Sequence, residues 1–97
     1  MRYKNSGTPQ EYQEILLYIL DTRKIITAKS AVEEAAFRCG ARALEALNEN
    51  GAQLQREHGI MLYHANNPGA HVLHDQYTRR AIEQAIHAID RMIEREA

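Results

Sequence analysis

The chain has 97 residues, of which 44% are hydrophobic and 26% are charged, and its formal net charge is -1. This composition is that of one globular domain over residues 1–97, and it excludes a disordered chain. The 12 basic residues nearly balance the 13 acidic residues. That balance disfavours nucleic acid as a partner, because neutralising phosphates requires a basic excess, and it disfavours an acidic mimic of DNA.

The chain ends and the cysteine usage indicate a cytoplasmic protein. Cys39 is the only cysteine, so an internal disulfide is excluded and a reducing compartment is favoured. Residues 1–8 are polar, lack the apolar run of a signal peptide and are predicted to be flexible. The longest apolar run, Ile15 to Leu20, is far shorter than the roughly 20 residues of a membrane span, so we expect no membrane partner.

The first predicted helix runs from Pro9 to about Lys24. Thr8 and Glu11 form a capping box around Pro9, whose missing N–H is harmless at a helix start. Leu17 and Tyr18 widen the apolar stripe and suggest a second buried surface, within the fold or against another copy. The stripe itself has helical spacing and comprises Tyr12, Ile15, Leu16, Ile19 and Leu20.

A second capping box, Ser30 to Glu33, predicts the start of the next helix. We expect one long helix from Ala31 to about Glu57, ended by His58 and Gly59. The alternative is a helix end and turn at Asn48–Gly51. Small residues along this helix, from Ala35 to Ala46, would let another helix approach closely.

Residues 60–74 leave two interpretations open. Ile60 to His64 could be a short strand that pairs with residues 70–74 across the turn at Asn66–Gly69, or the whole segment could be a loop. The last helix is predicted to start at His74 or Asp75. Its buried stripe would comprise Ile82, Ala85, Ile86, Ile89, Met92 and Ile93.

These elements predict an all-α fold, a small helical bundle built on a long antiparallel helical hairpin plus an N-terminal helix, with a possible short β-hairpin at residues 60–74. A core of this size is often reinforced by association, so we expect a homo-oligomer. On the last helix, Arg79 and Glu83 are four residues apart and are expected to pair.

No pattern in the chain indicates catalysis. It lacks a phosphate-binding glycine loop, a nucleophile motif and a CxxC pair, so we expect no enzyme, no catalytic residues and no cofactor. Cys39 lies on an apolar stripe and is interpreted as a buried small hydrophobe. Four of the five histidines lie between His58 and His74, which leaves surface histidines as the main interpretation, with a metal site and a proton-sensitive switch as alternatives.

The candidate binding site lies at the start of the last helix. Tyr77, Arg79 and Arg80, with His74 just before them, combine an aromatic ring with guanidinium groups that can hold a phosphate. The loop residue Tyr63 is the next candidate. The alternative is a solvated first turn whose long side chains reach into water.

Two segments carry a resemblance to a known family. Ile82 to Arg95 resembles the last helix of small phage helical-hairpin proteins that sequester cyclic nucleotides and so inhibit the CBASS and Thoeris defences. Asn48 to Leu54, with its Asn-x-x-Gly-x-x-Leu spacing, is similar to a segment upstream of that helix in the same family. The resemblance implies an oligomeric, non-enzymatic anti-defence protein that binds a small phosphorylated ligand.

The function expected from the sequence is therefore that of a small non-catalytic binding protein, in the form of a cyclic-nucleotide sponge. The alternative is a regulator or inhibitor that binds another protein through an exposed helix face. A histidine-based metal-binding protein is the minor alternative.

Overall fold

The computed structural model describes residues 7–70 and 75–96, and within these residues it contains four α-helices and no strand. The predicted all-α fold is confirmed. The helices are α1 (Pro9–Thr22), α2 (Ala31–Asn48), α3 (Gln55–Asn66) and α4 (Asp75–Glu96).

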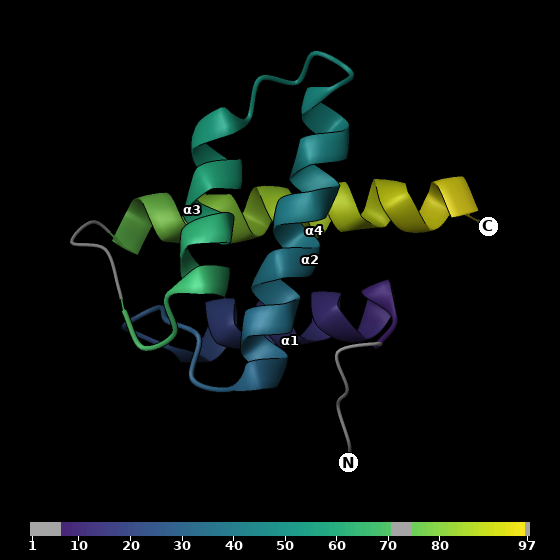
Figure 1. Ribbon diagram of the computed structural model, residues 1–97. Coiled ribbons are helices and arrows are strands. Elements are labelled where there is room, and N and C mark those ends of the chain that lie inside the picture. Colours follow the sequence, from purple (N-terminus) through teal and green to yellow (C-terminus); the bar gives the residue numbers. More distant parts are fainter. Residues whose placement is uncertain (1–6, 71–74, 97) are drawn as a thin grey trace.

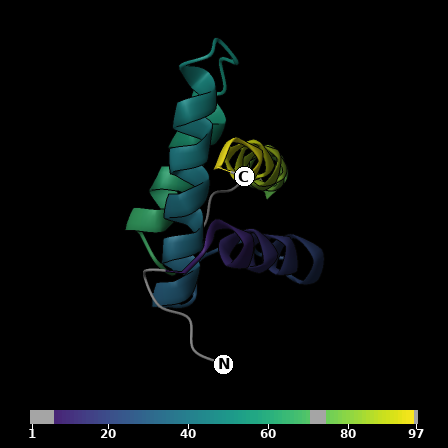
Figure 2. The ribbon, with the colours of Figure 1, turned by 90° about the vertical axis from the view of Figure 1, so that its right-hand side faces the viewer.

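The helices form two layers. Helices α2 and α3 form an antiparallel hairpin, and α1 and α4 cross one side of it (Figure 1). From the side, the hairpin is one layer, and α1 and α4 lie next to each other as the second (Figure 2). Helices α1 and α4 run in opposite directions (Figure 1). Because α1 contacts α2 and α4 but not α3, much of its surface faces solvent.

Both predicted capping boxes mark helix starts, but they differ in one bond. At α1 the Thr8 hydroxyl accepts from the Glu11 N–H, and the Glu11 carboxylate accepts from the Thr8 N–H. At α2 the Ser30 hydroxyl accepts from the Glu33 N–H at 3.3 Å. The Glu33 carboxylate accepts instead from the Lys29 N–H, at 2.8 Å, because it is also bonded to an arginine in the preceding loop.

The single long helix predicted from Ala31 to about Glu57 is wrong, because α2 ends at Asn48 and α3 begins at Gln55. The Asn48 side chain accepts from the Leu54 N–H at 2.5 Å and so closes the connection. Gly51 has a φ of 86°, in the left-handed region that glycine adopts without a steric penalty. The turn chemistry at Asn48–Gly51 therefore outweighs the helical periodicity.

The possible β-hairpin over residues 60–74 is also wrong for its described part, because Ile60 to His64 belong to α3; residues 71–74 lie outside the described residues. The expected helix end at Gly59 does not occur either. A glycine inside a helix costs only about 1 kcal/mol, and the helix is held by the burial of Met61, His64 and Ala65 along one face.

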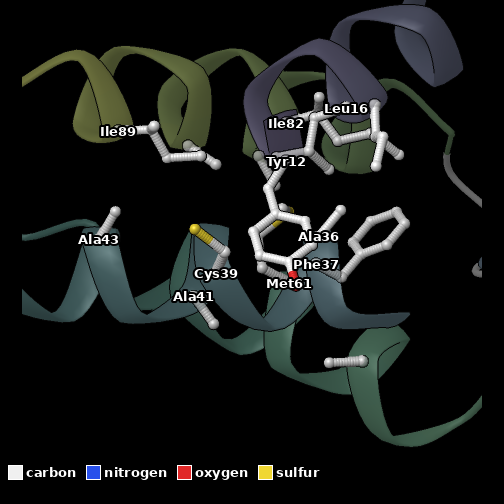
Figure 3. Close-up of a cluster of buried hydrophobic side chains, with 14 of the residues drawn as sticks. Tyr12, Leu16, Ala36, Phe37, Cys39, Ala41, Ala43, Met61, Ile82 and Ile89 are labelled. Atoms are coloured by element: carbon white, nitrogen blue, oxygen red, sulfur yellow. The ribbon is translucent and has the colours of Figure 1, made fainter. Parts of the chain in front are cut away.

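The core lies between the two layers. Figure 3 shows Tyr12 and Leu16 of α1 and Ile82 and Ile89 of α4 facing side chains of α2. The largest fully buried side chains of the core come from all four helices and one connection: Phe37, Leu16, Ile19, Ile26, Leu44, Met61, Ile82, Ile89, His64 and Thr78.

Gly40 occupies the point where the four helices meet. A Cβ atom at this position would lie 2.6 Å from Met61 Cε, 3.0 Å from Ala85 Cβ and 3.4 Å from Leu16 Cδ1. These three atoms belong to α3, α4 and α1, so the absence of a side chain lets the two layers approach. The small residues of α2 are therefore used within the fold.

The accessible surface is 5995 Å². A monomeric protein of 11.1 kDa is expected to expose about 5,700 Å², so the chain buries about as much surface as a monomer of its mass. The homo-oligomer stays a prediction, because the monomer buries enough surface without a partner. Among the helices of the described residues, none has the length and apolar character of a membrane span.

Candidate functional site

The residues of the predicted site at the start of α4 do not lie together, because Arg79 and Arg80 contact different helices. Arg79 lies against the end of α1, where its Nη1 donates to Leu20 O at 3.0 Å and its Nη2 donates to Arg23 O at 2.5 Å. Helix α1 has no basic residue in its last turn, so Arg79 supplies the positive charge that its terminal carbonyls favour. In the described residues Arg79 does not pair with Glu83.

Arg80 and Tyr77 lie at the surface between α4 and α3. Arg80 Nε donates to Glu57 Oε2 at 3.2 Å, and the Glu57 side chain is 11% exposed. The guanidinium carbon of Arg56 lies 5.3 Å from the centre of the Tyr77 ring. The first two turns of α3 and α4 are therefore joined by two contacts, Arg80 with Glu57 and Arg56 with the Tyr77 ring.

The two remaining predicted residues do not join this cluster. Tyr63 lies two helical turns from Arg56 on α3, is partly exposed, and meets the His64 ring edge-on with centroids 5.5 Å apart. His74 lies outside the described residues. Sequence reasoning missed Arg56 and Glu57, because they were placed inside a long helix and only the α2–α3 turn brings them to α4.

A second surface, which we name the α1 face, consists of the outward residues Glu14, Leu17, Tyr18 and Asp21 with Ile25 just beyond the helix. Leu17, Tyr18 and Ile25 are 46%, 59% and 56% exposed, the largest values for bulky hydrophobic residues among those described. Helix α1 contains three acidic residues and no basic residue. The α1 face is therefore both apolar and acidic.

A hollow of about 320 Å³, which we name the α1–α2 hollow, adjoins this face. Its apolar walls are Ile15 and Val32, and the Tyr18 side chain lies at its edge. The carboxylates of Glu14 and Glu33 complete the lining. Sequence reasoning identified the extra apolar positions Leu17 and Tyr18 but missed this hollow, because Val32 and Glu33 come from a different helix.

Glu33 is held at one side of the hollow by a bidentate ion pair. Arg23 Nη1 and Nη2 donate to its two carboxylate oxygens at 2.6 and 2.5 Å, and both side chains are largely buried. Burial alone would raise the pKa of Glu33, but the hydrogen bonds from Arg23 and from the Lys29 N–H outweigh burial and lower it. Hydrogen bonding to Glu33 in turn raises the pKa of Arg23.

A larger hollow of about 550 Å³ lies between the C-terminal ends of α2 and α4. Arg91 and Arg95 line it and have no hydrogen-bond or ion-pair partner among the described residues. Glu94 and Glu96 also line the hollow, so its charge is mixed. The apolar part of its lining consists of Ala43, Ala46, Leu47, Ala88 and Met92.

Of the five histidines, His71 and His74 lie outside the described residues. Within the described residues, no group of three or more His, Cys, Asp or Glu side chains is placed to hold a metal ion. His64 is fully buried, and its ring centre lies 5.2 Å from that of Phe37. Cys39 is buried, as predicted, and burial raises the pKa of its thiol, so the nucleophilic thiolate is disfavoured.

Comparisons of the chain with protein families, with curated proteins and with solved structures found no match.

Proposed function

We propose that this protein is a non-catalytic binding protein whose partner is another protein, held by the α1 face. The observation that carries the proposal is the exposure of the adjacent residues Leu17 and Tyr18 on the outer side of α1, where Tyr18 also lines a partly apolar hollow. Contiguous exposed apolar residues mark interaction surfaces in proteins, and tyrosine is enriched among the residues that contribute most to binding.

The exposed residues are not needed to attach α1 to the fold. The opposite side of the helix buries Tyr12, Leu16 and Ile19, which are 5%, 0% and 0% exposed. The Gln13 side chain also donates to Ile86 O of α4 at 3.0 Å. Because α1 is already fixed by these contacts, Leu17 and Tyr18 are surplus to the core and available to a partner.

A second copy of the chain, bound through the same face, fits this surface poorly. On the helix, the α1 face carries Glu14 and Asp21 and no basic residue, so two α1 faces would bring like charges together. This charge pattern favours a different protein over a symmetric α1–α1 dimer.

Photo-cross-linking tests the proposal. Benzoylphenylalanine replaces Leu17 in one variant and Glu45, an exposed residue of α2, in the matched control. We expect the variant at position 17, but not the control, to form one dominant cross-link to another protein in extracts of the native cells. Equal labelling from both positions, or no cross-link from position 17, would contradict the proposal.

The second candidate function is capture of a small phosphorylated ligand, including a cyclic nucleotide. It is favoured by Arg91 and Arg95, which line the 550 Å³ hollow beside Glu94 and Glu96 and have no partner among the described residues. The volume of this hollow lies within the range of ligand pockets. Calorimetry with a panel of cyclic di- and trinucleotides tests it, with the Arg91→Gln/Arg95→Gln variant as control. Binding heat from one nucleotide that is absent with the variant would support this function. The absence of binding heat with folded wild-type protein would rule it out.

A further inference from the structure

We infer that the α1–α2 hollow receives a lysine or arginine side chain from an amphipathic basic segment of the partner. This inference rests on the proposed function and names the chemistry that the α1 face recognises.

The size of the hollow favours a single side chain. At about 320 Å³ it lies at the lower end of the range for small-molecule sites. Its apolar walls, Ile15 and Val32, match the methylene stem of a long basic residue, which buries its carbon atoms and leaves its charge at the edge.

The charge of the lining selects a cation. Glu33 is already neutralised by Arg23 and accepts the Lys29 N–H, so its acceptor capacity is largely used. Glu14 is exposed and has no hydrogen-bond or ion-pair partner among the described residues, which leaves one free carboxylate at the edge of the hollow. A guanidinium or ammonium group at this edge would pair with Glu14 and lie close to the Tyr18 ring.

The rest of the α1 face also favours a basic partner. Leu17 lies beside Tyr18, and Asp21 follows one turn further along the exposed side. A helix of the partner that presents apolar residues and basic residues on one face would therefore bury Leu17 and Tyr18 and pair with both Glu14 and Asp21. An acidic or phosphorylated segment would be repelled by Glu14 and Asp21.

The hollow can be tested with a probe that mimics the end of an arginine side chain. Methyl NMR spectra of the full-length protein are recorded during titration with n-butylguanidinium and, separately, with n-butylurea, its neutral counterpart. We expect n-butylguanidinium to shift the methyl signals of Ile15 and Val32, and to bind about tenfold more weakly to Glu14→Gln. The matched control Glu45→Gln should bind like the wild type.

Equal shifts from n-butylurea, no shift of these methyl groups, or unchanged binding by Glu14→Gln would each overturn the inference. These outcomes are separate from the cross-linking result. A cross-link from position 17 to a segment without basic residues would leave the proposed function standing and remove only the basic partner.

Discussion

The crossing at Gly40 and the face of α1 use apolar surface in opposite ways. At the crossing, atoms of α1, α3 and α4 lie so near Gly40 that a single added carbon would come within 3.4 Å of all three helices. On the α1 face, less than 25 residues earlier in the chain, Leu17 and Tyr18 extend into solvent with about half of their surface exposed. Both regions belong to the same small fold, yet only the crossing at Gly40 is fully packed.

This contrast separates what stabilises the fold from what is left for binding. Close packing at the crossing makes the free energy of unfolding sensitive to one methyl group. The α1 face has no such neighbours, so its side chains can be exchanged at little cost in stability. Substitutions at the crossing should therefore change the free energy of unfolding strongly, and substitutions on the α1 face should change it little.

The largest effect is expected at the crossing itself. Gly40→Val should lower the free energy of unfolding by about 3 kcal/mol or more, because its branched side chain has no room. Gly40→Ala should lower it by about 1–2 kcal/mol, since overpacking exceeds the gain in helix propensity. Urea denaturation measures both values.

A compensating substitution sharpens this prediction. Met61 Cε can move aside, but Ala85 Cβ is fixed to the α4 backbone at 3.0 Å from the added carbon. Adding Ala85→Gly to Gly40→Ala should therefore cost less than the sum of the two single substitutions. Strict additivity would show that the two helices do not meet as closely as described.

The next effect is expected at the Arg23–Glu33 pair, which ties the α1–α2 connection to α2. Glu33→Gln should cost about 2–3 kcal/mol at neutral pH, because it leaves the largely buried Arg23 without its carboxylate. The folded protein lowers the pKa of Glu33, so this contribution is complete above the unfolded pKa of about 4.3 and is lost as the pH falls through the folded pKa.

Unfolding curves of the wild type and Glu33→Gln between pH 3 and pH 7 measure that dependence. The stability difference between the two proteins should be constant above about pH 5 and should shrink below pH 4. A difference that stays constant throughout this range would show that Glu33 contributes nothing through its charge.

A smaller effect is expected where α4 caps α1. Arg79→Met keeps much of the aliphatic stem but removes the donors to Leu20 O and Arg23 O, and should cost about 1–2 kcal/mol. Arg91→Met, which changes an exposed residue of α4 with no partner among the described residues, is the control and should cost less. Equal losses would contradict the capping role of Arg79.

A glycine-to-alanine substitution, which lowers stability at the crossing, should raise it on the exposed side of α3. Gly59 lies inside the helix, and an added Cβ would meet nothing within 4 Å. Gly59→Ala should therefore raise the free energy of unfolding by about 0.5–1 kcal/mol. A loss of stability in thermal unfolding would mean that this side of α3 is covered.

The sequence was sufficient for the helices whose ends have clear chemistry. Thr8 with Pro9 and Ser30 placed the starts of α1 and α2, and the spacing from Ile82 to Ile89 identified the buried side of α4. It was insufficient where two local signals compete. Periodicity continued through Asn48–Gly51, but the Asn48 side chain favoured a turn, which created α3 as a separate helix.

The candidate site was harder to predict, because it depends on contacts between distant segments. Arg79 and Arg80 are adjacent in the sequence, yet one binds the end of α1 and the other binds Glu57 of α3. Nothing in the local pattern distinguishes them. The extra apolar residues Leu17 and Tyr18 were visible in the sequence, but whether they pack inside the fold depends on where α4 and α2 lie.

The most direct test of the account is a paired measurement on the double variant Leu17→Ser/Tyr18→Ser. We expect its free energy of unfolding to stay within about 0.5 kcal/mol of the wild type. We also expect that the variant no longer competes with the position-17 photo-cross-linking protein for its partner, whereas the wild type competes. A variant that unfolds, or one that competes as well as the wild type, would contradict the claim that the α1 face is the binding surface.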